Sequence, residues 1–258
     1  IATITIDRTE RGNSLTTAMQ AMFRAIWADV RDNPDVRVAV IVAAGERHFC
    51  TGFDVSVADS DDAADDIFVN KPLRESVFWS PYQNDVWKPV ICVVNGTCVG
   101  GGHHFVVDAD IVVASRNAKF IDSHVNVGMV GAIENIGLAK RLPLGTALRM
   151  TLMGNSYRLT SERAHQLGLV DELAETPEEA RALAQEMAQQ MLKNSPQAMA
   201  LSKRAIWGSL EKGYEESLEE GWALLRSHWT HPDFEEGPKA FAEKREPAWN
   251  PDPDAKIE

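Results

Sequence analysis

The glycine triplet Gly100-Gly101-Gly102 is the feature that most constrains the fold of this chain. It follows an apolar, β-branched run, Val90 to Val94, and precedes a predicted short helix that ends near Ala109. Free N–H groups at the start of a helix, together with its dipole, favour an anion, and glycine lets a ligand approach that backbone closely. The segment predicts an anion site of backbone donors, although three glycines are also typical of a tight turn. Because no Gly-Lys-Ser or Gly-Lys-Thr follows, a Walker-type phosphate loop is excluded.

A second segment of the same kind lies earlier in the chain, at residues 45–54. It ends in Cys50-Thr51-Gly52-Phe53-Asp54, so that a short predicted strand again runs into a glycine. Around the two segments, β-branched runs alternate with amphipathic stretches, whereas the last third of the chain shows helical patterns throughout. This order predicts an α/β fold followed by an all-α region that begins near residue 195.

Periodicity and capping residues predict the element boundaries. Thr176-Pro177-Glu178-Glu179 is typical of a helix start, with a capping Thr, Pro at the first helical position and Glu at the third. Residues 56–66 are acidic and poor in apolar side chains, which indicates a loop. We expect strands at 1–6, 36–43, 90–94, 111–114, 118–121 and 169–173, and helices at 14–32, 71–86, 134–153 (as one or two helices) and 161–167.

Charge and cysteine content narrow the class of protein. The net charge of −12 disfavours binding to nucleic acid or to an anionic membrane. No apolar run is long enough to cross a bilayer, and the first residues are not typical of a secretory leader. Cys50, Cys92 and Cys98 are odd in number and lack the CxxC spacing of a metal or redox site. We therefore expect a cytoplasmic protein with no nucleic-acid or membrane partner.

Taken together, the two glycine segments resemble those of the crotonase superfamily, which contains enoyl-CoA hydratases and isomerases. Residues 45–54 are similar to the family's G-x-G-x-x-F-C-x-G-x-D segment, and residues 88–102 to its K-P-V-I-A-x-V-N-G-x-x-x-G-G-G segment. Further similarities lie at 110–120, at 159–171 and at 241–245, the last of which resembles the family's A-F-x-E-K-R. The resemblance covers nearly the whole chain.

This resemblance implies a crotonase-like spiral of ββα units over residues 1–194 and an α-helical trimerisation region over 195–258. It implies an acyl-CoA substrate, with coenzyme A as part of that substrate and neither a separate cofactor nor a metal, and a homotrimer or a dimer of trimers. It also implies an oxyanion hole made by the backbone N–H groups of Phe53 and Gly101. Contacts to CoA are implied for a further set: Gly52, Asp54, Gly100, Phe241 and Lys244.

The chain departs from the family where hydratases carry two catalytic glutamates. One position lies two residues after the glycine triplet and is His104 here; the other lies four residues after Phe120 and is His124. A two-glutamate hydration mechanism therefore does not carry over. Histidine titrates near neutral pH, so His104 and His124 are candidate acid–base groups, although a single histidine is more often structural. The adjacent His103 points about 100° away on a helix and is expected to be a spectator.

Two carboxylates complete the candidate catalytic set. Asp122 shares a face with His124 if that stretch is extended, so Asp122 can hold the imidazole in one tautomer. Glu134 follows a glycine-containing loop after which the family sometimes places a catalytic Asp or Glu; alternatively, it complements its helix dipole. A zinc site built from the histidines has no supporting ligand-spacing motif.

Three functions remain open at this point. The first is an enoyl-CoA hydratase/isomerase-type lyase, with a place in fatty acid metabolism, that uses His104, His124 and Glu134 around an enolate. The second is a hydrolase of a C–C bond, as in the β-diketone hydrolases of the superfamily, or of a thioester, with His124 as base and Asp122 as its orienting partner. The third is a non-catalytic CoA-binding subunit. The resemblance implies that residues 56–87 line the acyl pocket, and their large apolar and aromatic side chains suggest a bulky or ring-bearing acyl group: Phe68, Val77, Phe78, Trp79, Tyr82 and Trp87.

Overall fold

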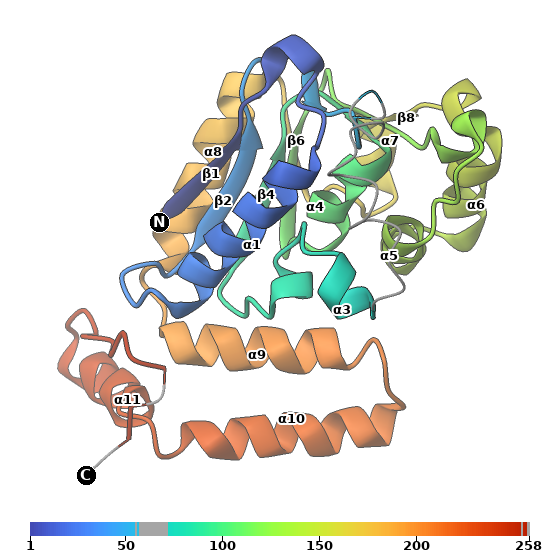
Figure 1. Cartoon of the computed structure of the whole chain (residues 1–258). Coiled ribbons are helices and arrows are strands. Elements are labelled where there is room, and N and C mark those ends of the chain that lie inside the picture. The colour runs from blue at the N-terminus through green and yellow to red at the C-terminus, as the bar shows by residue number, and fades with distance from the viewer. Residues whose placement is uncertain (55, 57–71, 254, 257–258) are drawn as a thin grey trace.

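The computed structural model describes residues 1–54, 56, 72–253 and 255–256. Two β-sheets share one hydrophobic core (Figure 1). The larger sheet is parallel, with strand order β1-β2-β4-β6-β9: β1 Ala2–Ile6, β2 Ala39–Ala43, β4 Val90–Val94, β6 Ile111–Ser115 and β9 Glu172–Ala174. The smaller sheet has the order β3-β5-β7-β8, with β8 antiparallel: β3 His48–Cys50, β5 Thr97–Val99, β7 Lys119–Ile121 and β8 Leu159–Thr160.

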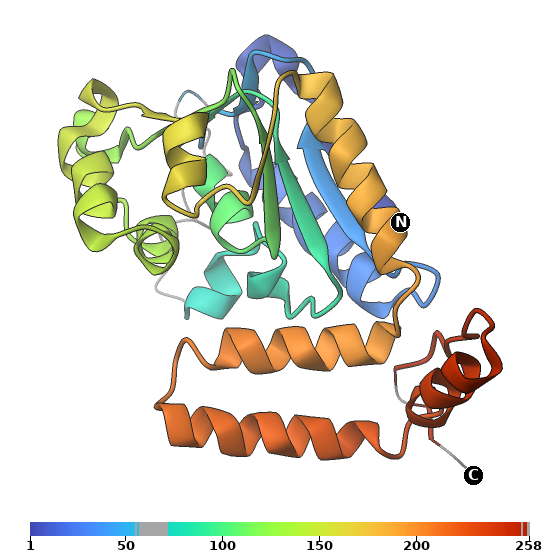
Figure 2. The same cartoon turned by 180° about the vertical axis from the view of Figure 1, so that it is seen from behind.

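From β2 to β7 consecutive strands alternate between the two sheets, so that each turn of the chain adds one strand to each. This is the predicted α/β spiral. All five residues of β2 and of β4 are buried, because helices cover both faces of the larger sheet, and this explains the continuous β-branched runs. Helix α1 (Thr17–Asp32) covers one face and helix α8 (Pro177–Met191) the other (Figures 1 and 2). The predicted capping of α8 is confirmed, since Thr176 Oγ1 accepts a hydrogen bond from the Glu179 N–H at 3.1 Å.

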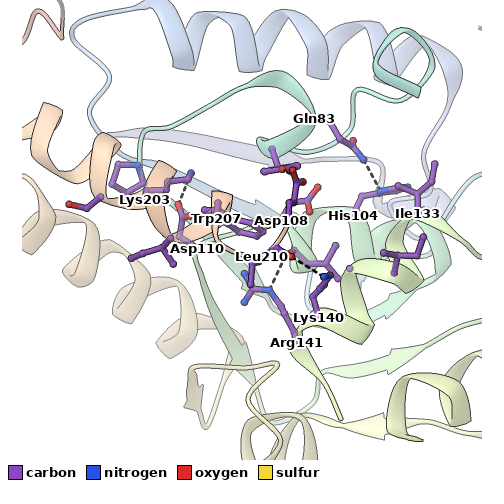
Figure 3. A pocket seen from close by; sticks show the side chains of 18 of the residues that line it. Gln83, His104, Asp108, Asp110, Ile133, Lys140, Arg141, Lys203, Trp207 and Leu210 are labelled. Atoms are coloured by element: carbon purple, nitrogen blue, oxygen red, sulfur yellow. Dashed lines mark hydrogen bonds and ion pairs between the residues drawn. The ribbon is translucent and has the colours of Figure 1, made fainter. Parts of the chain in front are cut away.

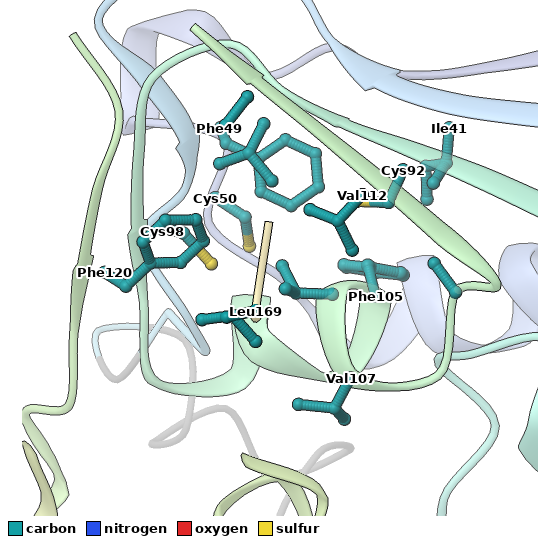
Figure 4. Close-up of a cluster of buried hydrophobic side chains, with 14 of the residues drawn as sticks. Ile41, Phe49, Cys50, Cys92, Cys98, Phe105, Val107, Val112, Phe120 and Leu169 are labelled. Carbon is teal, nitrogen blue, oxygen red and sulfur yellow. The ribbon is translucent and has the colours of Figure 1, made fainter. Parts of the chain in front are cut away.

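The core between the sheets holds the two aromatic side chains Phe49 and Phe120 against the aliphatic residues of the larger sheet (Figure 4). Phe105 of helix α4 (His103–Val107) lies 6.2 Å from Phe49 and 4.9 Å from Phe23, measured between ring centroids. The three cysteines are free and buried in the same core. Burial raises the pKa of the Cys50 thiol to about 12, so the core keeps it neutral.

The remaining helices lie around the small sheet and below the core. Helix α5 (Ile133–Arg141) and helix α6 (Leu144–Met153) meet at Leu142-Pro143, which confirms the predicted break in the 134–153 segment. The other short elements are η1 Thr9–Arg11, α3 Leu73–Ser76, η2 Tyr82–Asn84, η3 Gly100–Gly102, η4 His124–Val127, η5 Gly154–Ser156 and α7 Ser161–Gln166.

The C-terminal region is helical, as predicted. Helices α9 (Pro196–Gly208) and α10 (Tyr214–His228) run side by side beneath the core, and α11 (Asp233–Glu243) lies beyond them near the C-terminus (Figures 1 and 2). Neither α9 nor α10 contains a buried residue. Lys203 of α9 ties this region to the core through an ion pair with Asp110, with 2.8 Å between Nζ and Oδ2.

Two predicted elements are wrong. In the described part of segment 71–86, α3 and η2 are separated by an irregular stretch, because the buried Trp79 turns its carbonyl to the indole N–H of Trp27 at 2.8 Å. The strand expected at 169–173 begins three residues later, because the N–H groups of Leu169 and Val170 donate to the Ala164 carbonyl in the turn after α7. The acidic loop predicted at 56–66 lies, apart from Ser56, outside the described residues, as does Phe68.

Candidate functional site

Two backbone N–H groups, those of Phe53 and Gly101, lie side by side on the wall of a small cavity. A methyl group built on Gly52 would lie 3.3 Å from the Gly101 nitrogen, and one built on Gly101 would lie 3.7 Å from the Phe53 nitrogen. Gly52 and Gly100 both have left-handed backbone, with φ of +85° and +49°. Within the turns and loops of the described residues, neither nitrogen donates to a backbone oxygen. The glycines thus let two chain segments approach closely, with the backbone nitrogens of Phe53 and Gly101 near each other beside the cavity.

Leu15 holds the Phe53 segment in place. Its N–H donates to the Gly52 carbonyl and its own carbonyl accepts from the Asp54 N–H, each at 2.8 Å. These bonds require an extended backbone at residue 15, so α1 begins at Thr17, with Thr16 as its cap, rather than at residue 14 as predicted. The extended backbone at Leu15 therefore shortens α1 at its N-terminus and holds the Phe53 segment in place.

A chain of hydrogen bonds fixes the imidazole of His124. Its Nδ1 lies 2.6 Å from Asp122 Oδ1, and its backbone N–H donates to the same oxygen at 3.1 Å. The other carboxylate oxygen of Asp122 accepts a bond from Asn135 Nδ2 at 2.6 Å. The segment is not extended as expected, because His124 opens the 3-10 helix η4, but this turn brings the two side chains together directly. His124 therefore donates from Nδ1 and presents Nε2 to the cavity.

Glu134, in the first turn of α5, lies between the two imidazoles. Its Oε1 is 3.0 Å from His124 Nε2 and its Oε2 is 3.6 Å from His104 Nε2. The side chain of Glu134 is only 6% exposed, and an imidazole lies on each side of its carboxylate. The first distance is that of a hydrogen bond and the second is too long for one. One oxygen is therefore committed to His124, and the other faces the cavity beside His104.

The tautomer of His104 follows from its contact with Gln83. Gln83 Oε1 accepts the N–H groups of Trp79 and Ser80 at 3.0 and 3.1 Å, which fixes the orientation of the amide. Its Nε2 must then be the atom that lies 3.2 Å from His104 Nδ1, and it donates to that nitrogen (Figure 3). A neutral His104 consequently carries its proton on Nε2, on the side of Glu134.

The pKa values of His104 and His124 are shifted in opposite directions. Burial lowers the pKa of His104 to about 4, so it is a neutral N–H donor under ordinary conditions. The hydrogen bond to Asp122 raises the pKa of His124, and the nearby Glu134 adds to this. Burial raises the pKa of Glu134. Burial also acts to raise the pKa of Asp122, but hydrogen bonds from His124 and Asn135 outweigh it and lower the value to about 2. Near neutral pH Asp122 is therefore ionised and His104 is a neutral donor. The Glu134–His124 pair, which lies between these two groups, holds a proton.

His104, His124 and Glu134 line a cavity of about 210 Å³ together with Phe53 and Gly101, and its other lining residues are apolar: Leu15, Trp79, Val130, Ala132 and Ile133. His104 and Ile133 also line a second cavity of about 940 Å³ between the core and α9. Of the predicted pocket residues, Trp79 borders the small cavity, whereas Val77 and Tyr82 border the large one.

Other predicted site residues lie elsewhere. Asp54 is buried and paired with Arg8 at 2.7 Å and with Arg11 at 3.3 Å. Hydrogen bonds from Ser56 and from Arg8 hold its pKa well below the usual range. Phe241 is 87% exposed. Lys244 ends α11 in left-handed backbone. His103 is fully buried, its Nδ1 bonded to the Gly100 carbonyl at 2.9 Å, and it lines neither cavity.

The described residues contain no group of three or more His, Cys, Asp and Glu side chains arranged to hold a metal ion. They also contain no helix long and apolar enough to cross a membrane.

Comparison with known proteins agrees with the fold and the glycine segments. The family model described as enoyl-CoA hydratase/isomerase matches residues 1–252. The (E)-benzylidenesuccinyl-CoA hydratase of Thauera aromatica is 33% identical over 96% of this chain and 95% of its own, and the carnitinyl-CoA dehydratase of Salmonella enteritidis is 32% identical over 96% and 94%. A crystal structure of an enoyl-CoA hydratase/isomerase from Mycobacterium paratuberculosis superposes with a TM-score of 0.85 at 33% identity, covering 97% of this chain and 94% of that one.

The chain therefore belongs to the enoyl-CoA hydratase/isomerase family, within the crotonase superfamily. Its relatives act on CoA thioesters, and the chain has the architecture of an enzyme of that class.

Proposed function

We propose that the protein is a hydratase that adds water across the α,β-double bond of an enoyl-CoA thioester, or removes it in the reverse direction. The observation that carries the proposal is the position of Glu134, between a neutral histidine and a histidine oriented by a carboxylate. Two of the similar proteins are named for hydration and dehydration of CoA thioesters, which supports the same reaction class.

The backbone donors would stabilise the charge that develops on the substrate. With the thioester oxygen on the N–H groups of Phe53 and Gly101, attack at the β-carbon moves the electron pair of the double bond onto that oxygen as an enolate. Donors fixed before the reaction need no reorganisation, and each is worth about 3 kcal/mol in related sites. Gly52 and Gly100 would admit the thioester, since any side chain would narrow that approach.

Glu134 would move the proton. Its Oε2 takes a proton from water as the water oxygen bonds to the β-carbon, while the Nε2–H of His104 orients that water beside it. The enolate then collapses to the thioester and its α-carbon takes a proton from the Glu134–His124 pair. Each water molecule thus adds one hydroxyl and one hydrogen to the substrate, and the pair returns to its starting state.

The test is mass spectrometry of products from a panel of enoyl-CoA and 3-hydroxyacyl-CoA thioesters, with binding measured on the same samples by calorimetry. A gain or loss of one water supports the hydratase. Binding of the thioesters without any chemistry would contradict it and favour a non-catalytic CoA-binding subunit.

A second candidate, hydrolysis of a C–C bond or of the thioester, is favoured by one observation. The Asp122–His124 contact of 2.6 Å is the geometry of an oriented general base, which can activate water. Free CoA or a ring-opened acid among the products would identify this reaction in place of hydration.

The proposal includes assembly as a homotrimer, or as a dimer of trimers, in the cytoplasm. Its support is that α10 leaves Leu218, Trp222 and Leu225 about half exposed while α9 and α10 bury no residue. In such an assembly Phe241 and Lys244 would contact the CoA held by a neighbouring copy. Sedimentation velocity of the purified chain tests this, and a monomer at micromolar concentration would contradict it.

A further inference from the structure

The large cavity continues from the site away from the backbone donors. It shares His104 and Ile133 with the small cavity and extends between α4, α5 and α9 (Figure 3). Its walls are largely apolar and partly aromatic, and Tyr82 and Trp207 lie 5.3 Å apart between ring centroids. An acyl group whose thioester sits on the backbone donors would pass His104 and enter this space.

Asp108 is one of the charged residues of this lining, which also contains Asp110, Glu211, Lys140, Arg141 and Lys203. It directly follows α4 and lies four residues after His104, so both side chains lie on one side of the helix and both border the cavity. Ser80 Oγ donates to Asp108 Oδ2. Among the described residues no hydrogen bond to Oδ1 is formed. Burial raises the pKa of this carboxyl to about 6, so it remains largely ionised at neutral pH.

The two cations beside Asp108 are engaged elsewhere. Arg141 donates from Nε to the Val107 carbonyl at 2.8 Å and from Nη2 to the Ala109 carbonyl. Lys203 is paired with Asp110. Asp108 therefore has an acceptor oxygen facing an apolar space with no protein donor on it, an arrangement that is costly unless a ligand supplies the donor.

We propose that Asp108 recognises a hydroxyl group at the far end of a ring-bearing acyl chain. This rests on the proposed function, since it takes the thioester to lie on the Phe53 and Gly101 donors. Four residues of helix advance about 6 Å, which is close to the distance from a β-carbon across a phenyl ring to a para substituent. A site built to bond a hydroxyl rejects the analogue that lacks it far more strongly than an apolar pocket distinguishes sizes.

Charge favours a hydroxyl over the alternatives. A distal carboxylate would face the Asp108 carboxyl and be repelled. A distal ammonium would also meet Arg141 and Lys203, whose positive charges act on the same carboxyl. A neutral hydroxyl donates to Asp108 and suffers neither repulsion.

The experiment compares two saturated thioesters that bind without reacting, 3-phenylpropanoyl-CoA and 3-(4-hydroxyphenyl)propanoyl-CoA, by calorimetry with the full chain. We expect the wild type to bind the hydroxylated probe about 10-fold more tightly, as a charge-assisted hydrogen bond would give. In Asp108→Leu the ratio of the two Kd values should fall to near one, and in Asp108→Asn, which keeps an acceptor, it should stay between these limits.

Ile136→Ala is the matched control, because Ile136 borders the same cavity without a polar atom. It should weaken both probes by the same factor and leave their ratio as in the wild type. Equal binding of both probes by the wild type, or a preference that survives Asp108→Leu, would overturn the role of Asp108 alone. If neither probe binds, the CoA thioester function itself fails. Asp108→Asn keeps the test decisive if the Leu variant does not fold.

Discussion

The two cavities that meet at His104 differ in almost every physical respect. The small one is lined by Glu134 and by His124, which contacts both Glu134 and the buried Asp122, next to the backbone of Phe53 and Gly101. The large one is several times larger and mostly apolar, and the Asp108 carboxylate borders it. The contrast indicates that the chemistry is confined to the small cavity and substrate selection to the large one. Changes in the first should act on kcat, and changes in the second on KM and on preference between substrates.

The largest effect is expected from Glu134→Gln. The variant keeps the shape of the side chain but removes the base, and acid–base groups of this kind contribute about 10³-fold to rate. We predict that kcat for an enoyl-CoA falls by about that factor while the Kd for a saturated thioester changes little. Steady-state kinetics and calorimetry measure the two quantities. Glu162→Gln, a surface substitution, is the control, and an active Glu134→Gln enzyme would remove Glu134 from the mechanism.

A smaller loss is expected from Asp122→Asn. Asp122 raises the pKa of His124, so its neutralisation should lower that pKa and move the corresponding limb of the pH–rate profile to lower pH. We expect kcat to fall by about 10- to 100-fold, since the proton of the imidazole is no longer fixed on Nδ1. A limb that stays where it is in the wild type would show that His124 does not titrate in the reaction.

Gln83→Leu should have a milder effect, about 10-fold on kcat. Gln83 fixes the proton of His104 on Nε2, and without it the other tautomer becomes accessible. Nitrogen-15 spectra of the histidines report the tautomer directly. The prediction fails if His104 keeps its Nε2–H form in the variant, and Gln166→Leu, at an exposed position, is the control for general effects of losing an amide.

A separate effect concerns stability alone and lies outside both cavities. Burial lowers the pKa of His103 to about 4 in the folded chain, below its ordinary value of 6.5. The unfolded state therefore binds the proton first, and stability is lost as pH falls from about 6.5 to about 4. His103→Asn keeps a donor for the Gly100 carbonyl and should reduce this acid loss by on the order of 2 kcal/mol. Urea unfolding at pH 7 and pH 5 measures it; an unchanged pH dependence would contradict the assignment.

The fold was predictable because the sequence patterns that indicate its helices and strands are local and agree with one another. Buried strands that run into glycines can be recognised from the residues themselves, and so can the capped start of α8 and the break at Pro143. The segment around Trp79 was not predictable, because its irregular backbone is set by a hydrogen bond to Trp27, more than fifty residues away. Burial of one aromatic side chain there outweighs the helical pattern of the sequence.

The candidate site was predictable only at positions that can be counted from the family's sequence motifs. Counting from the glycine triplet and from Phe120 leads to His104 and His124, and the structure brings both to Glu134. Gln83, Asn135 and Leu15 were missed, although they fix the tautomer, the carboxylate and the backbone donors. Each acts through a contact between segments distant in sequence, and an amide or a leucine carries no motif. Two weak signals could have suggested the amides. Gln83 lies shortly before a buried strand, and Asn135 lies in the first turn of the helix that carries Glu134.

Oxygen-18 labelling distinguishes hydration of the double bond from hydrolysis of the substrate. The protein is incubated with an enoyl-CoA thioester in water enriched in oxygen-18, beside Glu134→Gln, and the acyl product is analysed by mass spectrometry. If Glu134 catalyses hydration, the wild type and not the variant forms a 3-hydroxyacyl-CoA that carries the label on its hydroxyl oxygen. Label in a free carboxylic acid, with release of CoA, would contradict hydration and assign the Asp122–His124 pair to hydrolysis.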